Sequence, residues 1–152
     1  MKPDDGANGL GLNRDLVLQR IQEIRGALDL LRIDAARPQS AFVADAQVVD
    51  AAKYRLLVAV EAAVSICTHV ASRLAARTPD SYAGCFEVLG GAGIVSTALA
   101  ERLGRTARFR NRLVHLYWKI DNERVWEILS ESLGDLEAYL DAIGALLEGE
   151  HA

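Results

Sequence analysis

The sequence predicts an all-α protein, folded as an antiparallel bundle of about five helices. Apolar residues recur at three- and four-residue steps in several long segments, which is the spacing of one buried helix face. Aromatic residues make up only 6% of the chain, whereas alanine, leucine and valine are abundant, and this composition favours packed helices over strands. At 152 residues, the length is that of a single domain.

The first helix is expected from about Arg14 to Ile33, with an apolar face formed by residues such as Ile21, Ile24 and Leu28. Residues 1–13 are rich in glycine, aspartate and asparagine and are predicted to be disordered, so the domain should span residues 14–150. The segment from Arg37 to Ser40, which contains Pro38, should end the first helix.

A long second helix is expected from about Asp45 to Arg77. Its middle, residues 56–64, is apolar on nearly every side, which indicates a helix surrounded by its own bundle or by a partner subunit. A line of polar residues at helical spacing runs along it, namely Glu61, Ser65, Thr68, His69 and Ser72. This line is either an internal hydrogen-bonding seam or dimer surface, or a support for a functional site. We favour the former, because most buried polar groups are simply hydrogen-bonded.

Three further helices complete the predicted bundle. A turn at residues 78–81 precedes a short helix from Tyr82 to Leu89, which the glycine cluster at residues 90–93 should break. A fourth helix runs from about Ile94 towards Tyr117, with Gly104 as a weak point or a close-packing position. The last helix is expected from Asn122 to Leu147, capped by Asp121.

Composition restricts the possible functions. A net charge of −4 argues against a protein that coats nucleic acid non-specifically. Cys67 and Cys85 lie in apolar segments without C-x-x-C spacing, so they are expected to be small buried residues in a reducing compartment, and neither a metal site nor a cofactor is predicted. The N-terminal residues lack the pattern of a signal peptide, and the apolar run from Leu56 to Val70 is short and interrupted by polar residues. We therefore expect a cytoplasmic protein.

The most informative segment is residues 102–121, which reads RLGRTARFRNRLVHLYWKID. Five arginines fall within eleven of its residues, although the chain as a whole is acidic. Such a run is often only a solvated helix face, but it also creates the local positive field that a phosphate-bearing substrate requires. We expect Arg105, Arg108 and Arg112 to contact RNA.

Within this segment, Asn111 and His115 are four residues apart and share one helix face, and Arg110 lies about 100° around the helix from Asn111. Imidazole can move protons at neutral pH, and guanidinium stabilises the charge that grows on a phosphate. RNA supplies its own nucleophile, the 2′-hydroxyl, so phosphodiester cleavage by these groups needs no metal. On spacing alone, a single histidine beside arginines is weak support for catalysis.

The run Arg110 to Tyr117, RNRLVHLY, followed by Ile120 and Asp121, resembles the signature of HepT-like toxins in the HEPN superfamily. The similarity extends over about residues 16–147. It implies a helical bundle that dimerises about a two-fold axis and cuts RNA, either tRNA or mRNA, without a metal. It also implies that Arg110, Asn111 and His115 are catalytic. The expected partner is a nucleotidyltransferase antitoxin of the MNT type, which adenylylates Tyr117 and so silences the toxin.

The chain departs from this family at Ser65, where members commonly have an acidic residue, so the contacts that support dimer coupling should differ. Two other functions stay open. The first is a non-catalytic HEPN helical module that binds a nucleotide or a nucleotidyltransferase partner, although such modules often lose the arginine–histidine pair. The second is a plain scaffold bundle, in which Trp118, Trp126 and the arginine face form an interaction surface. Trp126 is expected in the core and Trp118 at a partly exposed position.

Overall fold

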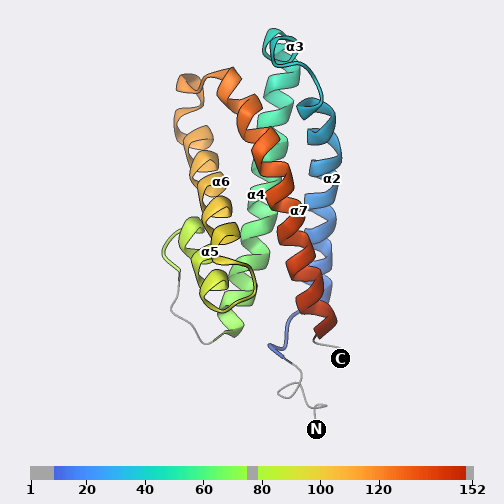
Figure 1. Cartoon of the computed structure of the whole chain (residues 1–152), viewed down its shortest axis with the longest axis vertical. Helices are drawn as coiled ribbons and strands as arrows, with labels where there is room; N and C mark the ends of the chain where they lie inside the picture. Colours follow the sequence, from blue (N-terminus) through green and yellow to red (C-terminus); the bar gives the residue numbers. More distant parts are fainter. Residues whose placement is uncertain (1–8, 75–78, 150–152) are drawn as a thin grey trace.

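The computed structural model describes residues 9–74 and 79–149, and within these ranges the chain forms helices and no strands. The helices in chain order are α2 (Arg14–Ala35), α3 (Gln39–Ala44), α4 (Ala46–Arg73), α5 (Tyr82–Gly91), α6 (Thr97–Leu116), the 3-10 turn η1 (Tyr117–Lys119) and α7 (Asn122–Gly149). The long helices run alternately up and down (Figure 1), which confirms the predicted all-α antiparallel bundle. Most of the N-terminal segment that was predicted to be disordered lies outside the described residues.

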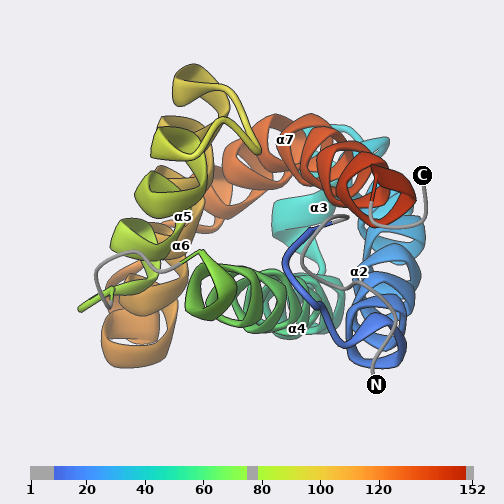
Figure 2. The ribbon, with the colours of Figure 1, turned by 90° about the horizontal axis from the view of Figure 1, so that it is seen from below.

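Seen along the bundle (Figure 2), α2, α4, α6 and α7 surround a common core, and α5 lies against α6. By length and composition, α4 is apolar enough to cross a membrane, but 56% of that apolar window is buried inside the bundle. Its apolar residues therefore form the core, as expected for a surrounded helix. The buried Tyr139 of α7 donates a hydrogen bond of 2.8 Å to the carbonyl of Ala63 in α4 and packs edge-on against Phe86 of α5.

The predicted helix boundaries need small corrections. The second helix ends at Arg73, before the predicted Arg77, and residues 75–78 lie outside the described part of the chain. Helix α6 begins at Thr97 instead of Ile94, because the Ser96 hydroxyl accepts a hydrogen bond from the backbone of Leu99 at 3.0 Å and caps the helix. The short helix α3 was not expected. Its fully buried Phe42 anchors this extra turn against the core.

The glycines of α5 and α6 allow these two helices to pack closely. A Cβ atom on Gly90 would lie 2.9 Å from the Cβ of Ala100, and one on Gly104 would lie 3.5 Å from the Cβ of Ala83. The contact is tight only at Gly90, whereas a Cβ on Gly104 would make an ordinary van der Waals contact, and Gly104 lies in an unbroken helix. Gly93, with φ of +77°, ends α5 in a backbone conformation that favours glycine. This close packing of α5 on α6 brings Tyr82, at the start of α5, next to Arg110 on α6.

Candidate active site

The predicted motif lies in the last two turns of α6, and the structure divides its residues between two sides of the helix. Arg110 continues the inner face that buries Leu103 and Leu113, and its side chain is only 19% exposed. His115 is exposed and Asn111 is partly buried. Because each residue turns the helix by about 100°, His115 lies about 140° around the axis from Arg110. One chain therefore places Asn111 beside Arg110 but aims His115 elsewhere.

The guanidinium of Arg110 is held by groups from three helices. One of its terminal nitrogens forms an ion pair with the carboxylate of Glu61 on α4. The other donates a hydrogen bond of 3.1 Å to the amide oxygen of Asn111. The guanidinium carbon lies 5.1 Å from the centre of the Tyr82 ring on α5, a cation–π contact. The orientation of Arg110 is thus fixed before any ligand arrives.

Tyr82 also ties the acidic partner into the same network. Its hydroxyl donates to the Glu61 carboxylate, at 3.1 and 3.2 Å from the two oxygens. Burial, followed by the hydrogen bond to Glu61 and the charge of Glu61, raises the pKa of Tyr82, while Arg110 lowers it to a smaller extent. Tyr82 therefore stays protonated at neutral pH and acts as a hydrogen-bond donor.

The Nε atom of Arg110 is buried and has no hydrogen-bond partner among the described residues. A guanidinium has five N–H donors in a planar fork, and the contacts above use only part of this capacity. Because Nε is buried, a phosphate oxygen would have to meet the unused N–H groups of the two terminal nitrogens.

Glu61 and Tyr82 were not predicted as site residues. Glu61 belongs to the polar line along α4, for which an internal hydrogen-bonding seam or dimer surface was favoured over support for a functional site, and its contacts with Tyr82 and Arg110 favour the second interpretation for Glu61. The other four residues of this line have their own contacts: Ser65 accepts from Arg20 at 3.1 Å, Thr68 contacts Cys85, His69 accepts from the backbone of Asn13, and Ser72 donates to the carbonyl of His69. One feature of the sequence could have identified Glu61 as a site residue: it is the sole Asp, Glu, Lys or Arg between Leu56 and Val70.

The two cysteines are buried, as predicted, and lie against each other between α4 and α5. Burial, together with the hydrogen bond to Cys85, raises the pKa of the Cys67 thiol far above its ordinary value. The Cys67 thiol therefore stays protonated and is a poor nucleophile and a poor metal ligand, whereas its hydrogen bond lowers the pKa of the Cys85 thiol. Within residues 9–74 and 79–149, no three or more histidine, cysteine or acidic side chains are grouped so that they could hold a metal ion.

The remaining predicted residues lie on the outer face of α6 or beyond its end. Arg105, Arg108 and Arg112 are exposed, and none forms an ion pair with a described residue, whereas Arg102 pairs with Asp135 of α7 at 2.8 Å. Tyr117 is the first residue of η1, and its side chain lies outside the described part of the structure. Trp126 is partly buried against the core and Trp118 is 65% exposed.

Two sequence comparisons place the chain among known proteins. Residues 17–143 match the family model described as ribonuclease HepT-like. A putative RNase from Archaeoglobus fulgidus is 33% identical over 95 residues, which cover 62% of this chain and 71% of the relative. The mRNA nuclease HepT from Shewanella oneidensis is 23% identical over 131 residues, which cover 86% of this chain and 98% of the relative.

Solved structures share the fold. A tri-AMPylated HEPN toxin from Shewanella oneidensis, in complex with an MNT antitoxin, superposes with a TM-score of 0.79 at 23% identity, over 86% of this chain and 98% of that one. YutE from Bacillus subtilis, described as a cytosolic protein of unknown function, also gives 0.79 at 16% identity, over 92% and 94% of the two chains. The match over residues 17–143, which contains the motif from Arg110 to Tyr117, shows that the chain belongs to the ribonuclease HepT-like family.

Proposed function

We propose that the protein is the toxin of a toxin–antitoxin pair and cuts RNA without a metal ion, using Arg110, Asn111 and His115. The observation that carries this proposal is the Arg110 guanidinium, which is oriented by Glu61, Asn111 and Tyr82 on the helix that also bears the exposed His115. A largely buried, oriented arginine on the same helix as an exposed histidine supplies the groups that phosphodiester cleavage needs.

The chemistry begins with the 2′-hydroxyl of the RNA, which attacks the adjacent phosphorus as it loses its proton. The bond to the 5′-oxygen of the next nucleotide breaks, and that oxygen takes up a proton. His115 serves one or both of these proton transfers, and Arg110 stabilises the negative charge that develops on the phosphate oxygens. Asn111, which already accepts from Arg110, keeps the guanidinium in place. The products are a 2′,3′-cyclic phosphate and a free 5′-hydroxyl.

A dimer would complete this site. Arg110 and His115 point about 140° apart on one helix, so a single chain does not aim them at one phosphate. The end of α6 also exposes large apolar side chains around His115: Val114 is 42%, Leu116 39% and Trp118 65% exposed. Packing these groups across a two-fold axis would bury them and bring the arginine of one chain towards the histidine of its partner.

We further propose that the partner is an MNT-type nucleotidyltransferase antitoxin that adenylylates Tyr117, and that the pair acts in the cytoplasm on mRNA or tRNA. The AMPylated Shewanella oneidensis toxin with its MNT antitoxin supports the partner, and the cytosolic YutE supports the compartment. The Shewanella oneidensis relative described as an mRNA nuclease favours mRNA as the substrate.

The test is to incubate purified protein with end-labelled mRNA and tRNA in the presence of excess chelator. Cleavage should persist and leave cyclic phosphate ends, and RNA methylated at the 2′-hydroxyl should stay intact. His115→Ala should abolish cleavage and keep the helical circular dichroism spectrum, because the side chain is exposed. His69→Ala, which removes the other described histidine, should still cleave. Cleavage by folded His115→Ala protein, or cleavage of DNA, would refute the proposed chemistry.

A further inference from the structure

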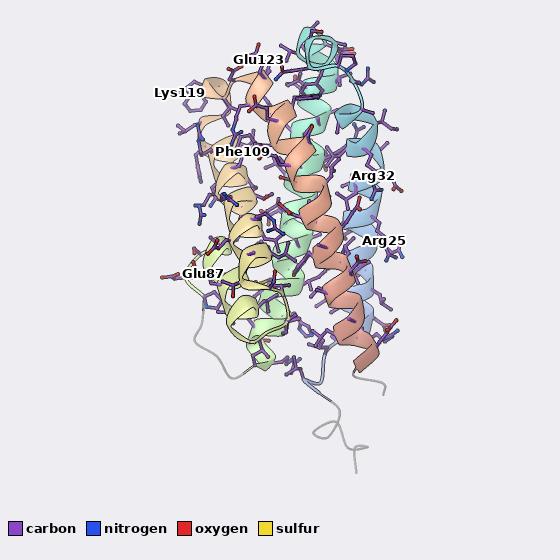
Figure 3. All side chains as sticks on the ribbon, viewed as in Figure 1. Arg25, Arg32, Glu87, Phe109, Lys119 and Glu123 are labelled. Carbon is purple, nitrogen blue, oxygen red and sulfur yellow. The ribbon has the colours of Figure 1, made fainter. Side chains whose placement is uncertain are left out.

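A groove with a volume of about 700 Å³ runs between α6 and α7, and neither Glu61 nor Arg110 lines it. Figure 1 shows why it exists: α7 starts beside the end of α6 and then crosses over to α2, so the two helices diverge. The floor is closed by Phe109, labelled in Figure 3 between the two helices, and by a buried contact of 3.1 Å between the hydroxyls of Thr106 and Ser132.

The groove is positively charged in a protein of net charge −4. Five arginines and two carboxylates line it, a net charge of +3. Two of these arginines are already paired: Arg102 with Asp135 at 2.8 Å, and Arg124 with Glu127 at 3.0 Å. The other three, Arg105, Arg108 and Arg112, form no ion pair with any described residue. Their charges are therefore available to an anionic ligand.

These three arginines form one continuous row with His115. Residues 105, 108, 112 and 115 follow each other at steps of three, four and three, so they lie along the outer face of α6. All four side chains are exposed. At 1.5 Å per residue, the row is about 15 Å long, and it leads from the groove to the proposed catalytic histidine. Its dimensions suit an extended polyanion better than a single phosphate.

The lining of the groove also indicates which part of a nucleic acid it would contact. Phe109 is the one aromatic residue among the described groove residues, and it is only 4% exposed, so no ring is available for a base to stack on. Arginine side chains in a row contact phosphates whatever the base sequence. A groove of this kind holds the backbone of a strand.

We propose that the α6–α7 groove binds the phosphodiester backbone of the RNA strand next to the cleavage position, with Arg105, Arg108 and Arg112 each contacting a phosphate. This site rests on the proposed ribonuclease function and extends it, because it is separate from the groups that perform cleavage. Because the contacts are between arginines and phosphates, RNA binding in this groove should tolerate any base sequence and depend strongly on the salt concentration.

The experiment measures binding of fluorescent twelve-nucleotide poly(U) RNA to the inactive His115→Ala protein at several salt concentrations. For single strands, the slope of log K against log salt is about −0.7 for each phosphate contact. Each of Arg105→Gln, Arg108→Gln and Arg112→Gln in this background should reduce the slope by about 0.7, and the triple variant by about 2. Arg25→Gln on α2, across the bundle in Figure 3, removes the same charge and should leave the slope unchanged.

The outcomes separate the two proposals. If the groove variants keep the full slope while the wild-type protein cleaves RNA, the groove proposal is wrong and the ribonuclease function stands. If the slope falls as expected but wild-type protein cleaves no RNA, the groove binds a strand and the proposed chemistry is wrong. If the triple variant loses binding to the antitoxin but not to poly(U), the groove is a docking surface for an acidic protein, which overturns the assignment.

Discussion

The Glu61 carboxylate and the Arg110 guanidinium form an ion pair that joins α4 to α6, and Tyr82 of α5 contacts both partners. The pair is asymmetric in its burial, because Glu61 is 44% exposed and Arg110 only 19%. Arg110 thus depends on Glu61 for compensation of its charge more than Glu61 depends on Arg110. A network of this kind holds a cation in one orientation, which is what a group that stabilises a transition state requires.

Glu61→Gln should therefore reduce cleavage more than it reduces stability. The change keeps the size of the side chain and removes the charge, and the partial exposure of the pair limits the loss of folding free energy to about 1 kcal/mol. We expect kcat for RNA cleavage to fall about tenfold, equivalent to about 1.4 kcal/mol. Urea unfolding and steady-state kinetics measure the two effects.

Tyr82→Phe is the matched control, because it keeps the ring under Arg110 and removes only the hydroxyl that donates to Glu61. Its effect on kcat should be smaller than that of Glu61→Gln. If Glu61→Gln cleaves as fast as wild type, the ion pair only joins helices. Faster cleavage would mean that Glu61 competes with the phosphate for Arg110.

The bundle could be predicted from the sequence because apolar spacing, Pro38 and the caps at Asp45 and Asp121 are local signals. The partners of Arg110 could not be predicted in the same way. Glu61 and Tyr82 lie 49 and 28 residues before it, and they meet it through the packing of α5 on both α4 and α6. Helical periodicity shows which side of a helix is buried, but it does not show which helix lies opposite.

Asp34 is a second buried charge that periodicity did not indicate, and it leads to a pH-dependent prediction. Its side chain is 5% exposed, with Arg37 and Arg55 each 3.7 Å from a carboxylate oxygen. Burial raises the pKa of Asp34 above 3.8, and the two arginines offset this only in part. The folded state thus binds the proton more tightly than the unfolded state, so this group costs stability as the pH rises above 3.8 through the folded pKa.

Asp34→Asn removes that cost, since an amide does not ionise. As the pH rises from about 4 to 7, the unfolding free energy of the variant should increase relative to that of the wild type. Urea unfolding of both proteins across this range measures it. A difference that is constant with pH, or that moves against the variant, would show that the arginines compensate the buried carboxylate in full.

The separation of Arg110 and His115 around α6 predicts that the active site is shared between two chains. Arg110→Ala and His115→Ala proteins should each be inactive, with the Arg110 loss on the order of 2–4 kcal/mol in transition-state stabilisation. When the two variants are co-expressed with different tags and the mixed dimer is purified, cleavage should reappear, because one chain supplies the arginine and the other the histidine. A mixed dimer without activity would place both groups in one chain, and a fully active monomer would exclude the shared site.

Tyr117 is predicted to be the residue through which the antitoxin silences the toxin. It follows His115 by two residues, at the point where α6 gives way to η1. An adenylyl group attached here would bring bulk and a negative phosphate close to His115 and the arginine row. Steric occlusion and like-charge repulsion would both oppose the RNA phosphate, as a phosphoryl group does beside an anion site. Modification at this position would therefore block the substrate without any need to unfold the bundle.

Tyr117→Phe should keep most of its ribonuclease activity and escape inhibition when incubated with the nucleotidyltransferase and ATP. Intact-mass measurement should show added AMP on the wild-type protein and none on Tyr117→Phe. Tyr54→Phe is the matched control: Tyr54 is 67% exposed and lies on α4, outside the motif from Arg110 to Tyr117, so this variant should be modified and silenced like the wild type. An adduct that persists on Tyr117→Phe would place the modified residue elsewhere. If neither protein gains AMP while both are inhibited, binding of the antitoxin alone blocks the active site, and Tyr117 has no part in the inhibition.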